Sequence, residues 1–138
     1  MPVEADQRTV ELLRTFYERW SAEDYVRAAT LLFDPEVELV QPSELPGGGG
    51  VYRGYEGLLR ALSENLEAFE YLHAEAERFD LDEETVVATV RLRAKGRHAG
   101  VDVDARIGHL FRFRGERAVR WEVYWSPEEA LEAAGLGR

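Results

Sequence analysis

The spacing of apolar residues changes once along this chain, and that change decides the fold class. Up to about residue 70 apolar side chains recur every three or four positions, as in Val10, Leu13 and Phe16, which predicts amphipathic helices. From Tyr71 to Ser126 apolar and polar residues alternate, which predicts β-strands. Helices followed by a run of strands indicate an α+β domain, in which the helices pack on one face of a mostly antiparallel sheet.

Three helices are expected in the first part of the chain and a short one at its end. Asp24 is expected to cap the second helix, and Asp34-Pro35 to end it. Ser126 followed by Pro127 is typical of a helix start, and Gly135 of a helix end. The helical residues expected to be buried are Val10, Leu13, Phe16, Tyr17, Trp20, Tyr25, Ala28, Ala29, Leu32, Leu58, Leu59, Leu62, Leu66 and Phe69.

The two central long strands, residues 86–97 and 101–114, can be aligned because their apolar faces must coincide. A two-residue turn at Ala99-Gly100 satisfies this condition and places Val90 opposite His109. A shift by one residue would turn one of the two apolar faces toward solvent. The pattern therefore predicts His109 on the apolar face of the sheet.

The neighbouring strands extend this sheet on both sides. A three-residue loop at 115–117 sets His109 opposite Val123 in the last strand. The strand that precedes the central pair is expected nearer an edge, with Glu75 opposite Arg91. His109 is thus expected in mid-strand between two valines, on the face that meets the helices. A twisted sheet wrapped around a helix leaves a cone with an apolar interior, a shape that suits a small ligand.

Composition and motifs exclude several classes of function. The chain has 17 basic and 27 acidic residues, a net charge of −10, which argues against a nucleic-acid partner. It has no cysteine, its three histidines are scattered, and it has no nucleotide-binding glycine motif, so we expect neither a metal nor a cofactor. We find no signal-peptide pattern and no apolar run near the roughly 18 residues of a membrane span, and we expect a cytoplasmic protein without membrane contact.

His109 is the residue best suited to chemistry, because imidazole titrates near neutral pH and serves as a general acid or base. Gln41 is expected on the inward face of a short strand, where its amide can orient a carbonyl or the imidazole. The alternative for His109 is a core histidine bonded to a neighbour, and the alternative for the aromatic residues is simple core packing. The residues expected to contact a ligand, besides His109, are Phe16, Tyr17, Trp20, Gln41, Tyr52, Leu62, Val90, Leu92, Ile107, Trp121 and Val123.

Six short segments stand in a particular order along the chain. They are Asp34-Pro35-Glu36-Val37-Glu38, Tyr52-Arg53-Gly54, Val101-Asp102-Val103-Asp104, Arg106-Ile107-Gly108-His109-Leu110-Phe111, Trp121-Glu122-Val123-Tyr124-Trp125 and Ala130-Leu131-Glu132-Ala133-Ala134-Gly135-Leu136. Taken together they resemble the nuclear-transport-factor-2-like superfamily and within it the SnoaL-like group, which is similar to polyketide cyclases and ketosteroid isomerases. The resemblance covers nearly the whole chain. It implies one domain over residues 1–138 with a cone-shaped, cystatin-like α+β barrel, in which three N-terminal helices pack on a curved, mostly antiparallel sheet.

The resemblance also implies where catalytic groups would lie. Ketosteroid isomerases carry an aspartate base where this chain has Gln41, and an oxyanion tyrosine where it has Phe16. The catalytic acid of these isomerases, of cyclases and of epoxide hydrolases corresponds to His109, and the second acid of the epoxide hydrolases to Val123. Steroid isomerisation and limonene-type epoxide opening are therefore disfavoured.

Three functions remain as alternatives for this sequence. The first is an enzyme that binds a small, largely apolar molecule and performs cyclisation, isomerisation or dehydration with His109. The second is a binding module without catalysis, and the third a dimerising interaction domain whose cone is filled by side chains. Val87, Leu110 and Tyr124 on the outer sheet face favour a homodimer, and the glycine run at 47–50 is either a lid or an ordinary surface loop.

Overall fold

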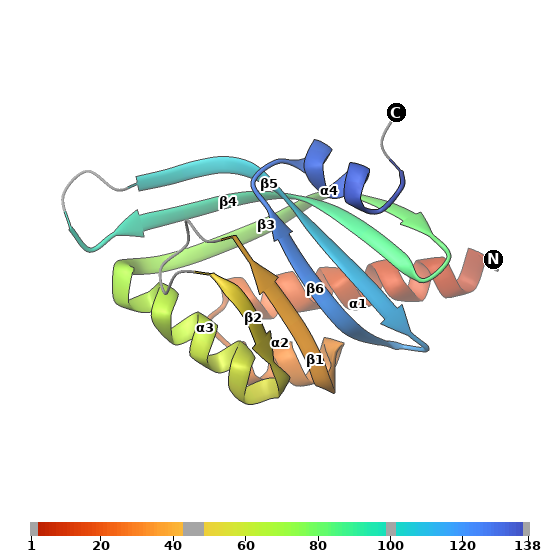
Figure 1. Cartoon of the computed structure of the whole chain (residues 1–138), viewed down its shortest axis with the longest axis horizontal. Coiled ribbons are helices and arrows are strands. Elements are labelled where there is room, and N and C mark those ends of the chain that lie inside the picture. The colour runs from red at the N-terminus through yellow and green to blue at the C-terminus, as the bar shows by residue number, and fades with distance from the viewer. Residues whose placement is uncertain (1–2, 43–48, 99–101, 137–138) are drawn as a thin grey trace.

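The computed structural model describes residues 3–42, 49–98 and 102–136 (Figure 1). Most of the expected glycine-rich loop and the expected turn at Ala99-Gly100 lie outside the described residues. Within the described part, no helix is both long enough and apolar enough to cross a membrane. The elements in chain order are α1 (Val3–Ser21), α2 (Tyr25–Leu32), β1 (Phe33–Gln41), β2 (Gly50–Arg53), α3 (Gly54–Ala68), β3 (Phe69–Asp82), β4 (Thr85–Gly96), β5 (Asp102–Arg114), β6 (Arg117–Tyr124) and α4 (Pro127–Ala133).

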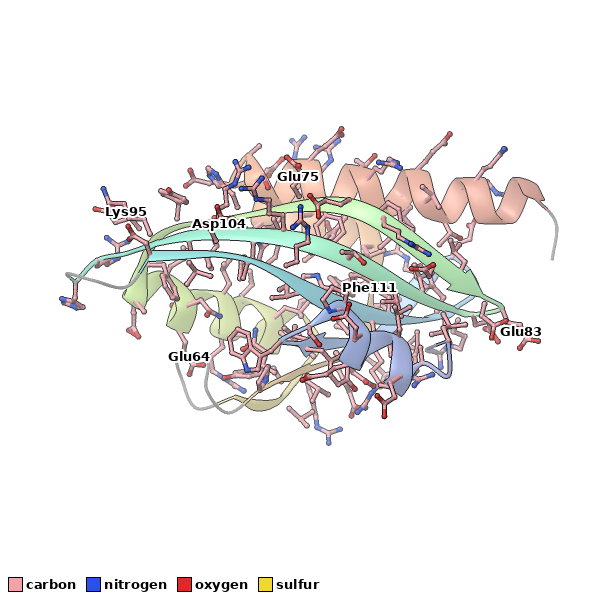
Figure 2. The ribbon with its side chains drawn as sticks, turned by 90° about the horizontal axis from the view of Figure 1, so that it is seen from above. Glu64, Glu75, Glu83, Lys95, Asp104 and Phe111 are labelled. Atoms are coloured by element: carbon pink, nitrogen blue, oxygen red, sulfur yellow. The ribbon has the colours of Figure 1, made fainter. Side chains whose placement is uncertain are left out.

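The described strands form one six-stranded sheet in the order β2-β1-β6-β5-β4-β3. Every neighbouring pair is antiparallel except β1 and β6, which run parallel. The sheet curves strongly, and α1, α2 and α3 lie on its inner side (Figures 1 and 2). The predicted α+β architecture, with three N-terminal helices on a curved and mostly antiparallel sheet, is confirmed.

Aromatic side chains fill the closed end of the space between helices and sheet. Phe16 of α1 and Phe111 of β5 are almost completely buried, and Figure 2 labels Phe111. The rings of Phe33 and Trp121 stack at 5.3 Å, and Phe16 meets Trp121 edge-on at 5.7 Å. Large rings in edge and stacked contacts bury much apolar surface per residue, which makes this cluster the main stabilising core.

The buried stripe of α3 departs from the prediction most clearly at Leu59. Leu59, expected in the core, is 40% exposed, whereas Asn65 is 7% exposed. The helical period places Leu58, Leu62 and Asn65 on one side, and Leu59 lies about 100° around the helix from Leu58.

The residue before α2 is Asp24, as predicted, but its side chain makes no capping hydrogen bond.

The predicted pairing of β4 with β5 was wrong by two residues, although the predicted face was right. His109 lies opposite Ala88, and Val90 lies opposite Ile107. Side chains alternate with a period of two, so a shift by two residues keeps every apolar residue on the inner face. The consequence for the site is that a small alanine, rather than a valine, neighbours His109 on this side.

The predicted partners of His109 in β6 and of Glu75 in β4 are confirmed. His109 lies opposite Val123 in β6, and Glu75 of β3 lies opposite Arg91 of β4. The strand β3 forms one edge of the sheet, as its weak alternation indicated.

The predicted three-residue loop at 115–117 is wrong. The turn has two residues, Gly115-Glu116, and Arg117 already pairs with Arg114; a register shift between Arg112 and Phe113 then brings the strands into the predicted pairing.

Helix α4 covers part of the outer sheet face. The Ser126 hydroxyl accepts a hydrogen bond from the backbone N–H of Glu129, which confirms the predicted cap. Val87 and Leu110, which favoured a homodimer through this face, are fully buried beneath α4 of the same chain. The homodimer therefore stays a prediction, and two of the three residues on which it was based are not available to a partner.

Candidate functional site

A cavity of about 270 Å³ lies between the inner face of the sheet and helices α1 and α3. Its walls are mostly aliphatic and aromatic, and none of the described residues that line it is an acid, a lysine or an arginine. Its volume lies just below the range of about 300 to 1,000 Å³ that is usual for small-molecule sites. The lining residues are Phe16, Tyr17, Trp20, Gln41, Asn65, Phe69, Leu72, Ala74, Leu92, Ala94, Val103, Ile107, His109, Trp121, Val123 and Trp125.

Most of the side chains predicted to contact a ligand meet at this cavity. They come from α1, β1, β4, β5 and β6, which the curved sheet brings around one space. The predicted residues that line the cavity are Phe16, Tyr17, Trp20, Gln41, Leu92, Ile107, His109, Trp121 and Val123.

Tyr52, Leu62 and Val90 were also predicted to line the pocket, but they lie in the packed interior outside it. Tyr52 sits on the edge strand β2, and its hydroxyl donates a 2.7 Å hydrogen bond to Glu64 on α3. Val90 is fully buried in the core cluster that also contains Phe16 of α1. Val90 faces inward as predicted. Whether an inward residue lines the cavity or lies in the packed core depends on how the helices pack on the sheet, which the alternation of residues does not give.

Asn65 lines the cavity although it was not predicted to contact a ligand. It is a polar residue on the buried stripe of α3, and its Nδ2 donates a 2.9 Å hydrogen bond to the Ala61 carbonyl. A polar side chain within an apolar helical stripe is the signal that would have identified it. Trp125, which continues the inward alternation of Trp121 and Val123, also lines the cavity.

His109 lies in the wall of the cavity and is 6% exposed. Its Nδ1 is 2.7 Å from the hydroxyl oxygen of Tyr17 on α1. The two rings are nearly parallel, with centroids 5.8 Å apart, and Trp121 meets the imidazole edge-on at 5.1 Å. The imidazole is therefore bonded to a core neighbour and also lines the cavity.

Burial keeps the Tyr17–His109 pair uncharged. It lowers the pKa of His109 to about 3 and raises the pKa of Tyr17 well above its ordinary value. The cause is the loss of water around groups that would carry a charge. The shared hydrogen bond has two directions: Tyr17 donates to Nδ1 and Nε2 carries the hydrogen, or Nδ1 donates to Tyr17 and Nε2 is an acceptor. Nε2 is therefore either a donor or a weak base toward a molecule in the cavity.

Two buried polar atoms of the cavity lining have no hydrogen-bond partner among the described residues. They are Oε1 of Gln41, an acceptor, and Nε1 of Trp121, a donor. Buried polar atoms in folded proteins are nearly always bonded to protein or to another molecule. In the described part of the chain, no three acidic or histidine side chains gather as a metal site would require.

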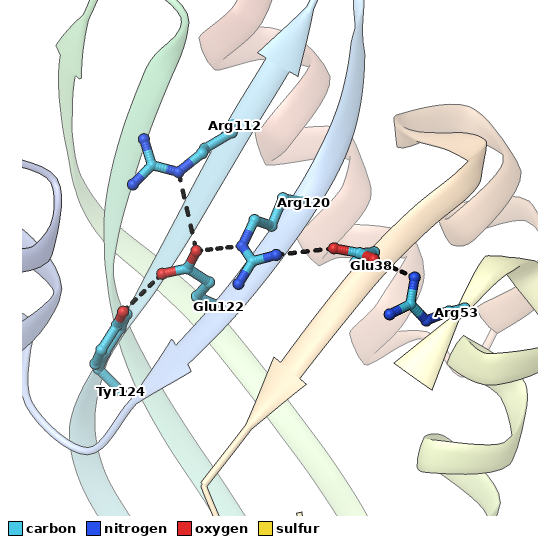
Figure 3. Close-up of polar contacts among 6 residues, drawn as sticks. All are labelled: Glu38, Arg53, Arg112, Arg120, Glu122 and Tyr124. Carbon is cyan, nitrogen blue, oxygen red and sulfur yellow. Dashed lines mark hydrogen bonds and ion pairs between the residues drawn. The ribbon is translucent and has the colours of Figure 1, made fainter. Parts of the chain in front are cut away.

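An ion-pair network on the opposite face of the sheet holds the strands that carry these residues (Figure 3). Buried Glu122 of β6 accepts hydrogen bonds from Arg120 and Tyr124, and Arg120 also bonds Glu38 of β1 at 2.8 Å. Glu38 in turn pairs with Arg53 of β2. Burial alone would raise the pKa of Glu122, but the hydrogen bonds from Tyr124 and Arg120 outweigh it and hold the pKa below its ordinary value. The network joins β6, β1 and β2 on the sheet face opposite to Trp121.

Comparison with known proteins agrees with this architecture. A model of the SnoaL-like domain family matches residues 13–121, which confirms the resemblance drawn from the sequence. No curated protein matches the chain.

Solved structures share the fold at low sequence identity. An NTF2-like protein of unknown function from Burkholderia pseudomallei K96243 has a TM-score of 0.77 and 18% identity, with 91% of this chain and 95% of that chain covered. TerC, co-crystallised with polyporic acid, has a TM-score of 0.77 and 18% identity, with 94% and 97% covered. A protein with a ketosteroid isomerase-like fold from Catenulispora acidiphila DSM 44928, in complex with trimethylamine, has a TM-score of 0.72 and 18% identity, with 91% and 93% covered. This similarity establishes the fold.

Proposed function

Because the chain belongs to the SnoaL-like domain family, we propose that it binds a small, largely apolar organic molecule and that the Tyr17–His109 pair moves a proton on that molecule. The observation that carries the proposal is the cavity of about 270 Å³ with apolar walls and His109 at its surface. Open space of this size favours a ligand over the alternative in which side chains fill the cone.

Two relatives support a small organic ligand. TerC was co-crystallised with polyporic acid and the Catenulispora protein with trimethylamine. The cavity here has aromatic side chains from α1 and β6 on two sides, which suits a flat organic molecule.

The chemistry that we propose starts from neutral imidazole. With a pKa of about 3, His109 is uncharged at neutral pH and begins as a base or as a hydrogen-bond donor rather than as an imidazolium acid. So weak a base removes a proton only from a carbon that is already acidic, such as one beside a carbonyl. Nε2 then takes that proton and returns it to another carbon of the same molecule, an isomerisation without net consumption of protons. Tyr17 steadies the imidazole through Nδ1.

Binding without catalysis is the second candidate, and the low pKa of His109 is the observation that favours it. The two candidates separate in a His109→Gln variant once a converted substrate is known. Loss of turnover with a near-normal Kd supports catalysis, whereas a higher Kd alone supports a binding module.

Binding is tested by calorimetric titration with naphthalene and 2-naphthol as flat probes. The wild type is expected to bind at least one of them. Val103→Trp, which fills the cavity from β5, is expected to weaken binding tenfold or more. Val26→Trp on α2, where the side chain is 59% exposed outside the cavity, is the matched control and is expected to bind as the wild type does. No binding by the wild type, or equal binding by Val103→Trp, would contradict the proposal.

A further inference from the structure

The unpartnered polar atoms of the cavity define a specific chemical requirement. Trp121 is 5% exposed, and its Nε1–H has no acceptor among the described residues. Gln41 is half-buried, but its Oε1 atom is shielded from solvent and has no donor there. A donor and an acceptor without partners, on two residues that line one cavity, point to a molecule that supplies the missing acceptor and the missing donor.

The sheet places these two residues close together. The strands β1 and β6 run parallel, with Leu39 opposite Trp121 and Val40 opposite Glu122. Gln41 is the next inward position along β1 after Leu39, so it stands on the neighbouring strand one inward step beyond Trp121. The ion pairs of Glu38 with Arg120 and Arg53 fix this part of β1 from behind (Figure 3).

We propose that the ligand of this cavity is an uncharged molecule with a hydroxyl group, which accepts a hydrogen bond from Trp121 and donates one to Gln41. This inference rests on the proposed function and names the ligand class. A hydroxyl is the smallest group that does both. A ligand without it leaves both protein atoms unbonded, and a site built to bond a hydroxyl discriminates strongly against such a ligand.

The absence of charge on the ligand follows from the lining. Among the described lining residues none carries a formal charge at neutral pH, so a carboxylate or ammonium group would lose its water without gaining a counter-charge. A hydroxyl group costs less to remove from water than a charged group does, and its two hydrogen bonds to the protein replace those that it made to water.

Two rival explanations predict different behaviour. If a resident water satisfies both atoms whether or not a ligand is bound, the hydroxyl on a ligand brings no advantage. If the hydroxyl lies against the Tyr17–His109 pair instead, the advantage persists when Gln41 and Trp121 are changed.

The test compares the Kd values of naphthalene, 2-naphthol and 2-naphthoate by calorimetry at pH 7.5. Wild type is expected to bind 2-naphthol about tenfold more tightly than naphthalene, the effect of about two neutral hydrogen bonds, and 2-naphthoate at least tenfold more weakly than 2-naphthol. Trp121→Phe and Gln41→Leu are each expected to reduce the preference for 2-naphthol about threefold and to leave the Kd of naphthalene nearly unchanged. Gln7→Leu, on the exposed side of α1, is the matched control and keeps the full preference.

Each outcome decides the matter. Equal Kd values for naphthalene and 2-naphthol, or a preference that survives in the substituted proteins, overturn the inference while cavity binding stands. Tight binding of 2-naphthoate overturns the requirement for an uncharged ligand. Failure of the wild type to bind any of the three refutes the proposed function itself. Should Trp121→Phe not fold, Gln41→Leu at the half-buried end of β1 carries the same test.

Discussion

Burial of neutral His109 makes the stability of the protein depend on pH, and a variant without an imidazole isolates this contribution. The pKa of His109 is lowered from 6.5 to about 3 in the folded chain. Below pH 6.5 the unfolded chain binds a proton that the folded chain does not, so folding stability falls as the pH falls through this window. For one proton, the free energy of unfolding changes by about 1.4 kcal/mol per pH unit.

The contribution of His109 to the pH dependence of stability is obtained by comparing the wild type with His109→Gln. The quantity compared is the free energy of unfolding of the wild type minus that of the variant. From pH 7.5 this difference is expected to decrease by about 1.4 kcal/mol at pH 5.5 and by about 2.7 kcal/mol at pH 4.5. Carboxylates titrate in both proteins and cancel in the difference. Urea denaturation followed by tryptophan fluorescence at each pH gives the values, with exposed His98→Gln as the control.

The difference between wild type and His109→Gln should therefore grow steadily toward low pH, while His98→Gln follows the wild type. A difference that stays constant from pH 7.5 to 4.5 would show that His109 protonates in the folded state as readily as in the unfolded one. The account of a neutral Tyr17–His109 pair would then be wrong.

Three further substitutions test the packing around the site. Tyr17→Phe leaves the buried Nδ1 of His109 without its 2.7 Å partner, and we expect the free energy of unfolding at pH 7.5 to fall by about 1–3 kcal/mol; an unchanged urea midpoint would contradict this. Gly108→Ala places a Cβ 2.5 Å from that of Ala130, so α4 must shift at a cost of about 1–3 kcal/mol, and adding Ala130→Gly should recover part of the loss in the same assay. Ser126→Ala removes the cap of α4 and should destabilise by about 1 kcal/mol, whereas loss of stability no larger than that of an exposed substitution would argue against the cap.

The alternation of apolar residues predicted the faces of the strands but not the β4–β5 pairing. A shift by two residues leaves the same residues inward, so no face argument separates Val90 from Ala88 as the neighbour of His109. The choice between them depends on the hairpin turn and on cross-strand charges, and Lys95 finds an acidic partner in either register. The predicted pairing of His109 with Val123 holds although the turn is one residue shorter than predicted, because the register shift between Arg112 and Phe113 compensates for the missing residue.

The contents of the site were only partly predictable for a different reason. Inward residues could be identified from alternation, but which of them meet open space depends on where α1 and α3 close on the sheet. Val90 therefore proved to be core, while Ala94 and Val103 on the same face line the cavity. The hydrogen bond between Tyr17 and His109 joins residues 92 positions apart and follows only from the packing of α1 on β5.

The direct measurement is a crystal structure of the protein soaked with 6-bromo-2-naphthol, with the bromine located by its anomalous scattering. The account predicts a bromine peak inside the cavity and the hydroxyl oxygen within hydrogen-bonding distance of Trp121 Nε1 and Gln41 Oε1. A bromine bound only on the outer surface, or side chains that close the cavity, would contradict it.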